Sequence, residues 1–394
     1  MEFPSSDRLH SFVAHEHDTS KLLAHAALQA KARNYADMMV VDVDSHHEEA
    51  GCYREIIPFI ESTVERQSAR SQTNEGRRAM VPRTISYDDG AGRMQRFALA
   101  ATEEVPDNLP RGVALARRAM DAMGVKYACL LPTTTLRLGM QPKREFEAGL
   151  ALAYNRWLVE TILPSDSRIR GMLYLPLYDA NACLESVLKL GGKPGIVGGV
   201  ITSARYMSIH ADEFIKVFAA MEERGLVLAF HSGTNWTDRT MGLLNSYSAV
   251  RALSAPHFNS VHMANWLMNG MPERFPKLNV LWMECGVGWV PSLMMRFDNE
   301  YMTRSFEAPL LRRKPSEYMR EMFYCSQPLD RPDDLSLLEA MFRAIAADTQ
   351  LVWGSNYPNA DFDLPSTIFD LPFLSAEAKQ NILGKTAAKL FRLN

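Results

Sequence analysis

The chain has 394 residues, a formal net charge of -3 at pH 7 and 47% hydrophobic residues, a size that allows one large barrel or two average domains. Charges of both signs are interspersed, which excludes the basic field that attracts nucleic acid or an anionic membrane. No apolar run reaches the roughly 18 residues that span a bilayer, so we expect a small-molecule or protein partner and no membrane partner.

The cysteines and the N-terminus bear on the compartment of the protein. Five cysteines are odd in number and lack CxxC spacing, so a disulfide framework or a structural zinc knuckle is not expected. The first residues have neither the basic n-region nor the apolar h-region of a secretory signal peptide. These features predict a cytoplasmic protein.

The first 37 residues differ from the rest of the chain. They are polar and then alanine-rich, and their four histidines show no regular ligand spacing. We predict an N-terminal extension, residues 1–37, with one helix that could pack on a neighbouring subunit. Residues 38–394 form the main domain.

From Met38 onward, short apolar runs alternate with stretches of helical period, which predicts repeated βα units and a parallel sheet. Predicted helices include 111–122, 145–163 and 212–224, the last followed by Gly225 as a stop signal. Eight strands predict a closed (β/α)8 barrel, a TIM barrel. These strands are 38–43, 125–131, 171–177, 196–202, 226–230, 279–283, 322–325 and 351–353.

A long connection follows the first predicted strand. It covers residues 51–110, and seven arginines lie among polar residues between positions 66 and 96. Its length is sufficient for a lid over a site or for a contact between subunits. In a lid, the arginines could bind a substrate carboxylate with paired hydrogen bonds, and on a surface they would simply be solvated.

Side chains that bind metal ions follow two of the predicted strands. Asp44 and His46 are two residues apart at the end of the first strand, so both point to the same side, while His47 points to the other. His231 closes the fifth strand. Because the C-terminal ends of barrel strands converge on one face, the sequence predicts a carboxylate and imidazole site for a divalent ion.

Other polar residues near the strand ends are further candidates. Glu49, in the loop after the first strand, could bind the same ion or orient a ligand. Glu284 closes the sixth strand, where an unpaired carboxylate would be costly, so we expect a metal, arginine or histidine partner. His257, in a predicted loop, is equally consistent with a functional role and with a plain loop residue. His262 is expected to pack or to lie on the surface.

The ordered segments resemble the amidohydrolase-related family, the branch of the amidohydrolase superfamily that includes aminocarboxymuconate-semialdehyde decarboxylase and the resorcylate decarboxylases. The resemblance runs from about residue 38 to 393, and it implies a distorted TIM barrel. The matching segments are VDVDSHHEE, MGVKYACLLPT, AYNRWL, GLVLAFHSG, ERFPKLNVLWMECGVGWVPSLMMRFD, LVWGSNYP and NILGKTAAKLF.

The resemblance also implies roles for individual residues. Asp44 and His46 match the first-strand metal pair, and His231 matches the fifth-strand metal histidine. Glu284 matches a position where many relatives have histidine and a subgroup has glutamate with a histidine in the preceding loop. His257, within PHFN, matches that loop histidine, although the subgroup's usual pattern is HPFE.

Two asparagines depart from the family pattern. Asn356 stands where the family has its eighth-strand aspartate, which is a metal ligand and often the base for the nucleophilic water. Asn359 stands where a histidine commonly follows. A carboxamide cannot accept a proton near neutral pH, so Asn356 cannot activate water, although it stays a candidate metal ligand.

The first functional hypothesis is a metal-dependent enzyme that acts on a small carboxylated or carbonyl compound, as a hydrolase or as a decarboxylase or other lyase. Glu284 or His257 would transfer the proton. The expected cofactor is a divalent metal, zinc first, with manganese and iron as alternatives. The missing water-activating carboxylate favours lyase chemistry, which relies more on the ion as a Lewis acid.

The second hypothesis is a supporting or mononuclear-metal subunit of a heteromeric metal-dependent oxygenase, a hydroxylase whose catalysis lies mainly in a paralogous partner. The two asparagines and the added N-terminal segment motivate it. We accordingly expect a homo-oligomer or a hetero-oligomer with a paralogous chain. A metal-free binding barrel ranks last, because it would bury converging charges without compensation.

Overall fold

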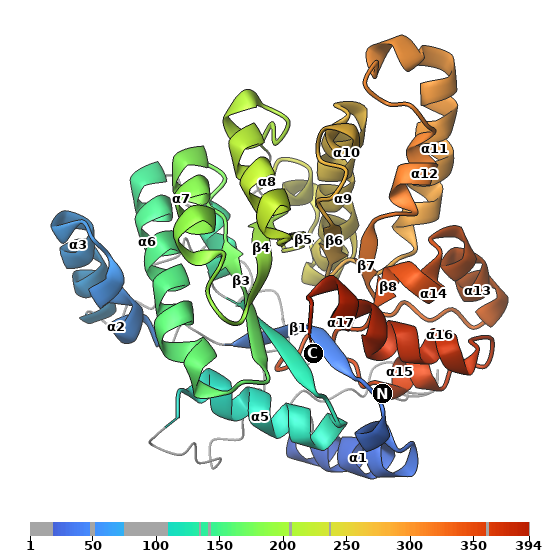
Figure 1. The fold of residues 1–394 in the computed structure, drawn as a ribbon, viewed down its shortest axis with the longest axis horizontal. Helices are drawn as coiled ribbons and strands as arrows, with labels where there is room; N and C mark the ends of the chain where they lie inside the picture. Colours follow the sequence, from blue (N-terminus) through green and yellow to red (C-terminus); the bar gives the residue numbers. More distant parts are fainter. Residues whose placement is uncertain are drawn as a thin grey trace.

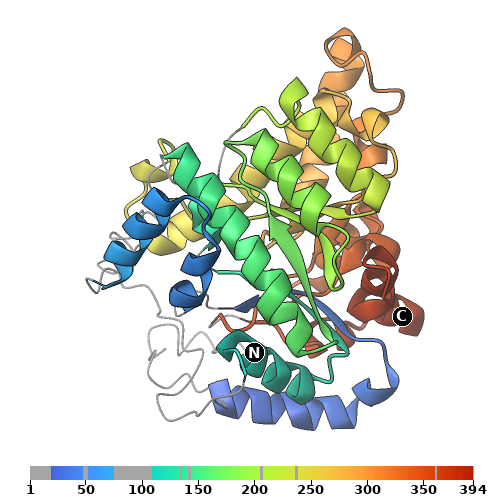
Figure 2. The ribbon, with the colours of Figure 1, turned by 60° about the vertical axis from the view of Figure 1, so that its left-hand side comes forward.

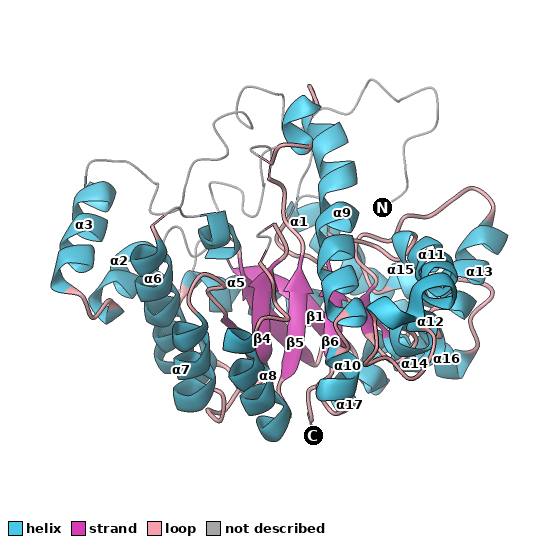
Figure 3. Ribbon diagram, turned by 90° about the horizontal axis from the view of Figure 1, so that it is seen from above, coloured by secondary structure: helices cyan, strands magenta, loops and turns pink. Residues whose placement is uncertain are grey.

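The computed structural model describes residues 19–47, 52–74, 109–133, 135–140, 143–204, 207–235, 238–359 and 362–393. Eight parallel strands lie side by side in chain order, surrounded by helices (Figures 1 and 3). The predicted TIM barrel is therefore confirmed. The strands are β1 (Val41–His47), β2 (Tyr127–Pro132), β3 (Ile169–Tyr174), β4 (Ile196–Thr202), β5 (Val227–His231), β6 (Val280–Met283), β7 (Phe323–Cys325) and β8 (Leu351–Val352).

Backbone hydrogen bonds join the first strand to the chain that follows the last one. The amide of Val43 donates to the carbonyl of Trp353 at 3.2 Å, and the amide of Asn356 donates to the carbonyl of Asp44 at 2.6 Å. The segment after β8 thus runs beside β1. This closure brings Asn356 next to the first predicted metal ligand.

Helices cover the outside of the barrel. Glycines in the left-handed conformation end two of them, Gly124 after α5 and Gly225 after α8, as the sequence predicts for the second. Among the described residues, no helix combines the length and apolarity that a membrane crossing requires. The principal helices are α5 (Arg111–Met123), α6 (Arg144–Trp157), α7 (Ala180–Leu190), α8 (Asp212–Arg224), α9 (Tyr247–Met268), α11 (Trp289–Arg304) and α13 (Leu335–Ala344).

Shorter helices complete the shell. The predicted helix 145–163 ends at Trp157 and continues as a wider π-helical turn, Leu158–Ile162, and a tight turn, Leu163–Ser165. The short helices are α10 (Met271–Arg274), α12 (Pro315–Met319), α14 (Ala347–Gln350), α15 (Ser366–Phe369), α16 (Ala376–Gln380) and α17 (Thr386–Leu390).

The N-terminal extension contributes the predicted helix, α1 (Thr19–Ala32). It lies along α5, as two views show (Figures 1 and 2). Leu23 and Ala26 are buried in the main hydrophobic core. The apolar side of α1 therefore packs on its own chain, whereas a role in subunit contact stays a prediction.

The long connection after β1 is described in part. Residues 52–74 form α2 (Tyr53–Ile56), a tight turn (Ile57–Phe59) and α3 (Thr63–Asn74). Residues 75–108 and Glu49 lie outside the described residues. The lid and interface interpretations of this segment, and the ligand role of Glu49, stay predictions.

Candidate metal centre

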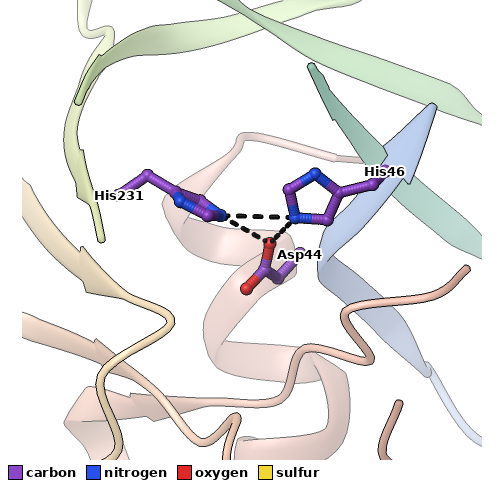
Figure 4. A group of neighbouring side chains, drawn as sticks. All are labelled: Asp44, His46 and His231. Atoms are coloured by element: carbon purple, nitrogen blue, oxygen red, sulfur yellow. Dashed lines mark hydrogen bonds and ion pairs between the residues drawn. The ribbon is translucent and has the colours of Figure 1, made fainter. Parts of the chain in front are cut away.

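Asp44, His46 and His231 converge at the C-terminal ends of β1 and β5 (Figure 4). Asp44 Oδ1 lies 3.1 Å from His46 Nε2 and 3.3 Å from His231 Nε2, and the two Nε2 atoms are 3.3 Å apart. All three residues are buried. The structure thus brings together the three predicted ligands that come from strands.

The outer ring nitrogens determine which atoms face inward. His46 Nδ1 donates to the carbonyl of Pro132 at 3.1 Å, and His231 Nδ1 donates to the carbonyl of Ser232 at 2.7 Å. A carbonyl only accepts, so each neutral ring carries its proton on Nδ1 and its lone pair on Nε2. Two lone pairs and a carboxylate oxygen within 3.3 Å repel one another unless a cation lies among them. This donor set fits a divalent metal ion.

The pKa values show the same need for a cation. Burial by itself lowers the pKa of His231, but the Asp44 carboxylate, with a smaller effect of Glu284, raises the pKa to about 9. Burial raises the pKa of Asp44, yet the two histidines outweigh it and hold the pKa well below its usual range. A proton on His231 therefore takes the position of a metal ion, and metal binding would displace it.

Glu284 follows β6 and lies beside this group. Its Oε2 is 3.5 Å from His231 Nδ1, and its Oε1 is 4.0 Å from a guanidinium nitrogen of Arg251. The hydroxyl of Ser232 donates to the Glu284 carbonyl and lies 3.3 Å from Oε2. The expected histidine and arginine partners are present. The side chain is 16% exposed, so the carboxylate is accessible to a small molecule.

Asn356 lies beside Glu284. Its Nδ2 donates to Glu284 Oε1 at 3.5 Å, and its Oδ1 accepts a hydrogen bond from Asn359 Nδ2. Asn356 and Glu284 both have left-handed backbones, with φ of 61° and 49°. This conformation is uncommon for residues other than glycine, least so for asparagine, and outliers of this kind concentrate at functional sites.

Asp42 is a site residue that the sequence analysis did not single out. Its buried carboxylate accepts hydrogen bonds from the amide and hydroxyl of Ser355 and from the amide of Asp44 at 3.1 Å. Burial raises its pKa to about 6, partly offset by the Ser355 hydrogen bonds. Asp42 thus fixes the strand that carries Asp44 to the residue before Asn356. The sequence signal that could have identified Asp42 was the alternation of apolar and acidic residues in VDVD.

His47 points away from the three ligands, as predicted. Its Nε2 lies 2.7 Å from the hydroxyl of Tyr154, and its ring stacks on Trp157 with 5.5 Å between centroids. Burial lowers its pKa to about 3, so the ring is neutral. The strand alternation therefore separates two adjacent histidines, one at the centre and one in the packing behind it.

The prediction that His257 lies in a loop is wrong, because the residue is inside helix α9. Asn259 and His262, three residues apart, form the buried face: Asn259 Nδ2 donates to the Met283 carbonyl at 3.4 Å, and His262 Nε2 to the Ser203 carbonyl at 3.1 Å. His257 precedes Asn259 by two residues, about 200° around the helix. Asn259 therefore contacts the residue before Glu284.

Comparisons with known proteins place this geometry in a family. The amidohydrolase family model (Amidohydro_2) matches residues 113–393. An amidohydrolase from Mycobacterium avium subsp. paratuberculosis K-10, map2389c, is 17% identical with a TM-score of 0.66, covering 90% of this chain and 99% of that one. The 5-carboxyvanillate decarboxylase LigW from Sphingomonas paucimobilis is 17% identical with a TM-score of 0.64, covering 91% and 100%.

A third solved structure is a dihydroxybenzoic acid decarboxylase from Polaromonas sp. JS666 with bound manganese and the inhibitor 2-nitroresorcinol. It is 15% identical with a TM-score of 0.63, and the match covers 91% of this chain and 98% of that one. At these identities the solved structures establish the fold. Because the family model covers well over half of the sequence, the chain belongs to the amidohydrolase family.

Proposed function

We propose that the protein is a metal-dependent decarboxylase of a small carboxylic acid. The observation that carries the proposal is the chain of hydrogen bonds from Asn359 to Asn356 to Glu284, next to the three converging ligands. Asn356 is a neutral amide at the position where water activation needs a carboxylate. Its hydrogen bond positions Glu284, a carboxylate that can transfer a proton. The decarboxylase activity of two structural relatives supports the same reaction class.

Asp44, His46 and His231 would hold a divalent ion. When bound, such an ion supplies a Lewis acid that binds and orients an acidic substrate. The donor set accepts zinc, manganese or iron. Manganese is the first ion to test, because the Polaromonas decarboxylase contains it.

Glu284 would serve as the proton-transfer group. In a decarboxylation the bond between the substrate carbon and its carboxylate breaks, the electron pair stays on the carbon, CO2 leaves, and the carbon gains one proton. Glu284 can hold this proton next to His231, and its partial exposure lets it contact the substrate. Ser232 and Asn356 position its carboxylate by hydrogen bonds.

The structural relatives described above are decarboxylases and an amidohydrolase, and they give no support to the oxygenase-subunit alternative. The hydrolase hypothesis would require Glu284 to act as the base for water. The subunit composition and the cytoplasmic location stay predictions.

The test is a substrate panel with the purified full chain loaded with manganese or zinc. Hydroxybenzoates and other small carboxylic acids are followed by NMR for CO2 release, and amides, esters and lactones for hydrolysis. We expect metal-dependent CO2 release that His231→Ala abolishes and that His47→Gln, the matched control at a histidine behind the site, retains. Metal-dependent hydrolysis without CO2 release from any acid would contradict the proposal.

A further inference from the structure

A cavity lies at the opposite end of the barrel from the candidate metal centre. It has a volume of about 660 Å³ and opens between the loops that precede β3, β4 and β5 and the end of the last helix. Its apolar wall includes Leu163, Ile169, Leu226 and Phe391. Along β3 alone, this end is separated from the other by roughly 17 Å. The cavity is therefore distinct from the candidate metal centre.

Four cationic side chains line this cavity, and its lining contains no acidic residue. They come from four separate segments of the chain, the start of β3, the loop before β4, the end of α8 and the segment after α17. The four are Arg170, Lys193, Arg224 and Arg392.

Two of these cationic side chains pack against glycines. The guanidinium of Arg392 lies directly against Gly225, where any Cβ would collide with it, and its Nη1 donates to the carbonyl of Arg224 at 3.3 Å. The Cδ of Arg224 lies 3.3 Å from the place where a Cβ on Gly191 would be. Arg392 has a left-handed backbone with φ of 54°. The local structure thus brings two guanidinium-bearing side chains together at the cavity.

Among the described residues, carboxylates neutralise these positive charges only weakly. In the part of the chain that the structure describes, Arg224 is the one member of the four that pairs with a carboxylate, and that partner, Glu223, is 81% exposed at 3.6 Å. Arg170 donates to the carbonyls of Ser167 and Ile169 and lies over the ring of Tyr127. Convergent cations beside an apolar wall repel one another and are stabilised by an anion.

We propose that this cavity binds an organic dianion, a phosphate monoester or dicarboxylate that carries an apolar group. The guanidinium groups provide donors in pairs, which suits phosphate and carboxylate oxygens. The apolar wall takes the hydrophobic part of the ligand. The site is separate from the proposed decarboxylase centre and does not depend on its activity.

Calorimetric titration with phenyl phosphate and with phthalate tests the proposal, with inorganic phosphate and neutral benzamide as comparison ligands. We expect phenyl phosphate or phthalate to bind wild-type protein, more tightly than either comparison ligand, and the affinity to fall as salt is added. Arg224→Ala and Arg392→Ala should each weaken binding about tenfold or more, because each removes a charge-assisted hydrogen bond. Whichever of phenyl phosphate and phthalate binds more tightly identifies the preferred class of anion.

Control variants locate the binding. Arg343→Ala removes an exposed arginine of α13 that pairs with Glu339, and His231→Ala alters the metal centre. Both should bind the probe like the wild type. Absence of binding at millimolar probe overturns the proposal, as does loss of binding in His231→Ala with retention in the arginine variants. Lys193→Ala, at an exposed residue, replaces either arginine variant that fails to fold, with the same expected direction.

Discussion

The side-chain amide of Asn356 donates a hydrogen bond to the carboxylate of Glu284, with 3.5 Å between Nδ2 and Oε1. Because Asn359 donates to the Oδ1 of the same amide, its NH2 group is directed toward Glu284. An asparagine in this position therefore directs a hydrogen-bond donor at the Glu284 carboxyl group. An ionised aspartate in its place would have no donor to offer.

This relationship predicts the effect of Asn356→Asp. A second carboxylate beside Glu284 removes the hydrogen bond and places two like charges together. Because a hydrogen bond to a charged group is lost, turnover of the metal-loaded protein should fall about tenfold or more. Asn359→Ala, which adds no charge and keeps the amide of Asn356, should lower turnover less. Equal losses for the two variants, or no loss in Asn356→Asp, would argue against the pairing.

Glu284→Gln separates proton transfer from metal binding. Glutamine keeps the size of the side chain but cannot transfer the proton, so turnover should fall by about 10²- to 10⁴-fold. Metal content should be unchanged, because Asp44, His46 and His231 remain. Elemental analysis and turnover are measured on the same preparation. Loss of the metal together with activity would instead make Glu284 a ligand.

Asp42 should control stability through its buried hydrogen bonds. Asp42→Ala removes the acceptor of two amides and one hydroxyl, which should lower the free energy of unfolding by about 2 to 4 kcal/mol. Asp42→Asn keeps an oxygen for the two amides and should lose less. Urea unfolding measures both variants. Equal losses would show that the hydrogen bonds are not the cause.

The pH dependence of stability provides a second test of Asp42. Its pKa is raised by burial to about 6 from 3.8, so the folded state holds this proton more tightly than the unfolded state. The resulting stabilisation, up to about 3 kcal/mol, is fully present below pH 3.8 and is lost as the pH rises through 6. Asp42→Asn should remove this contribution. Parallel pH profiles for the wild type and Asp42→Asn would contradict the assignment.

Periodicity was sufficient to predict the barrel and the positions of its three inward candidate ligands, Asp44, His46 and His231. Each strand is a short apolar run that ends at the functional face, so a polar residue at its end, such as His231, is placed by the strand itself. The contact between Asn356 and Glu284 joins residues 72 positions apart through two left-handed backbones. Such contacts depend on loop conformations that local pattern does not specify.

His257 illustrates a second limit of prediction from the sequence. Proline removes a backbone donor and usually interrupts a helix, which made a loop at Pro256 the natural prediction. In the structure α9 continues through Pro256, and the face that carries Asn259 and His262 is buried. Tertiary packing on β4 and β6 outweighs the local cost of the proline, and Asn259 contacts the barrel through the carbonyl of Met283.

Metal content is the most direct test of the central claim that Asp44, His46 and His231 form a divalent-metal site. Equilibrium dialysis against manganese with elemental analysis should find about one ion per wild-type chain, the content expected of a single three-ligand site. Chelation should remove it and lower the melting temperature. Asp44→Ala, His46→Ala and His231→Ala should each lose the ion, while His47→Gln retains it. A wild type without metal, or ligand variants that bind manganese as the wild type does, would contradict the claim.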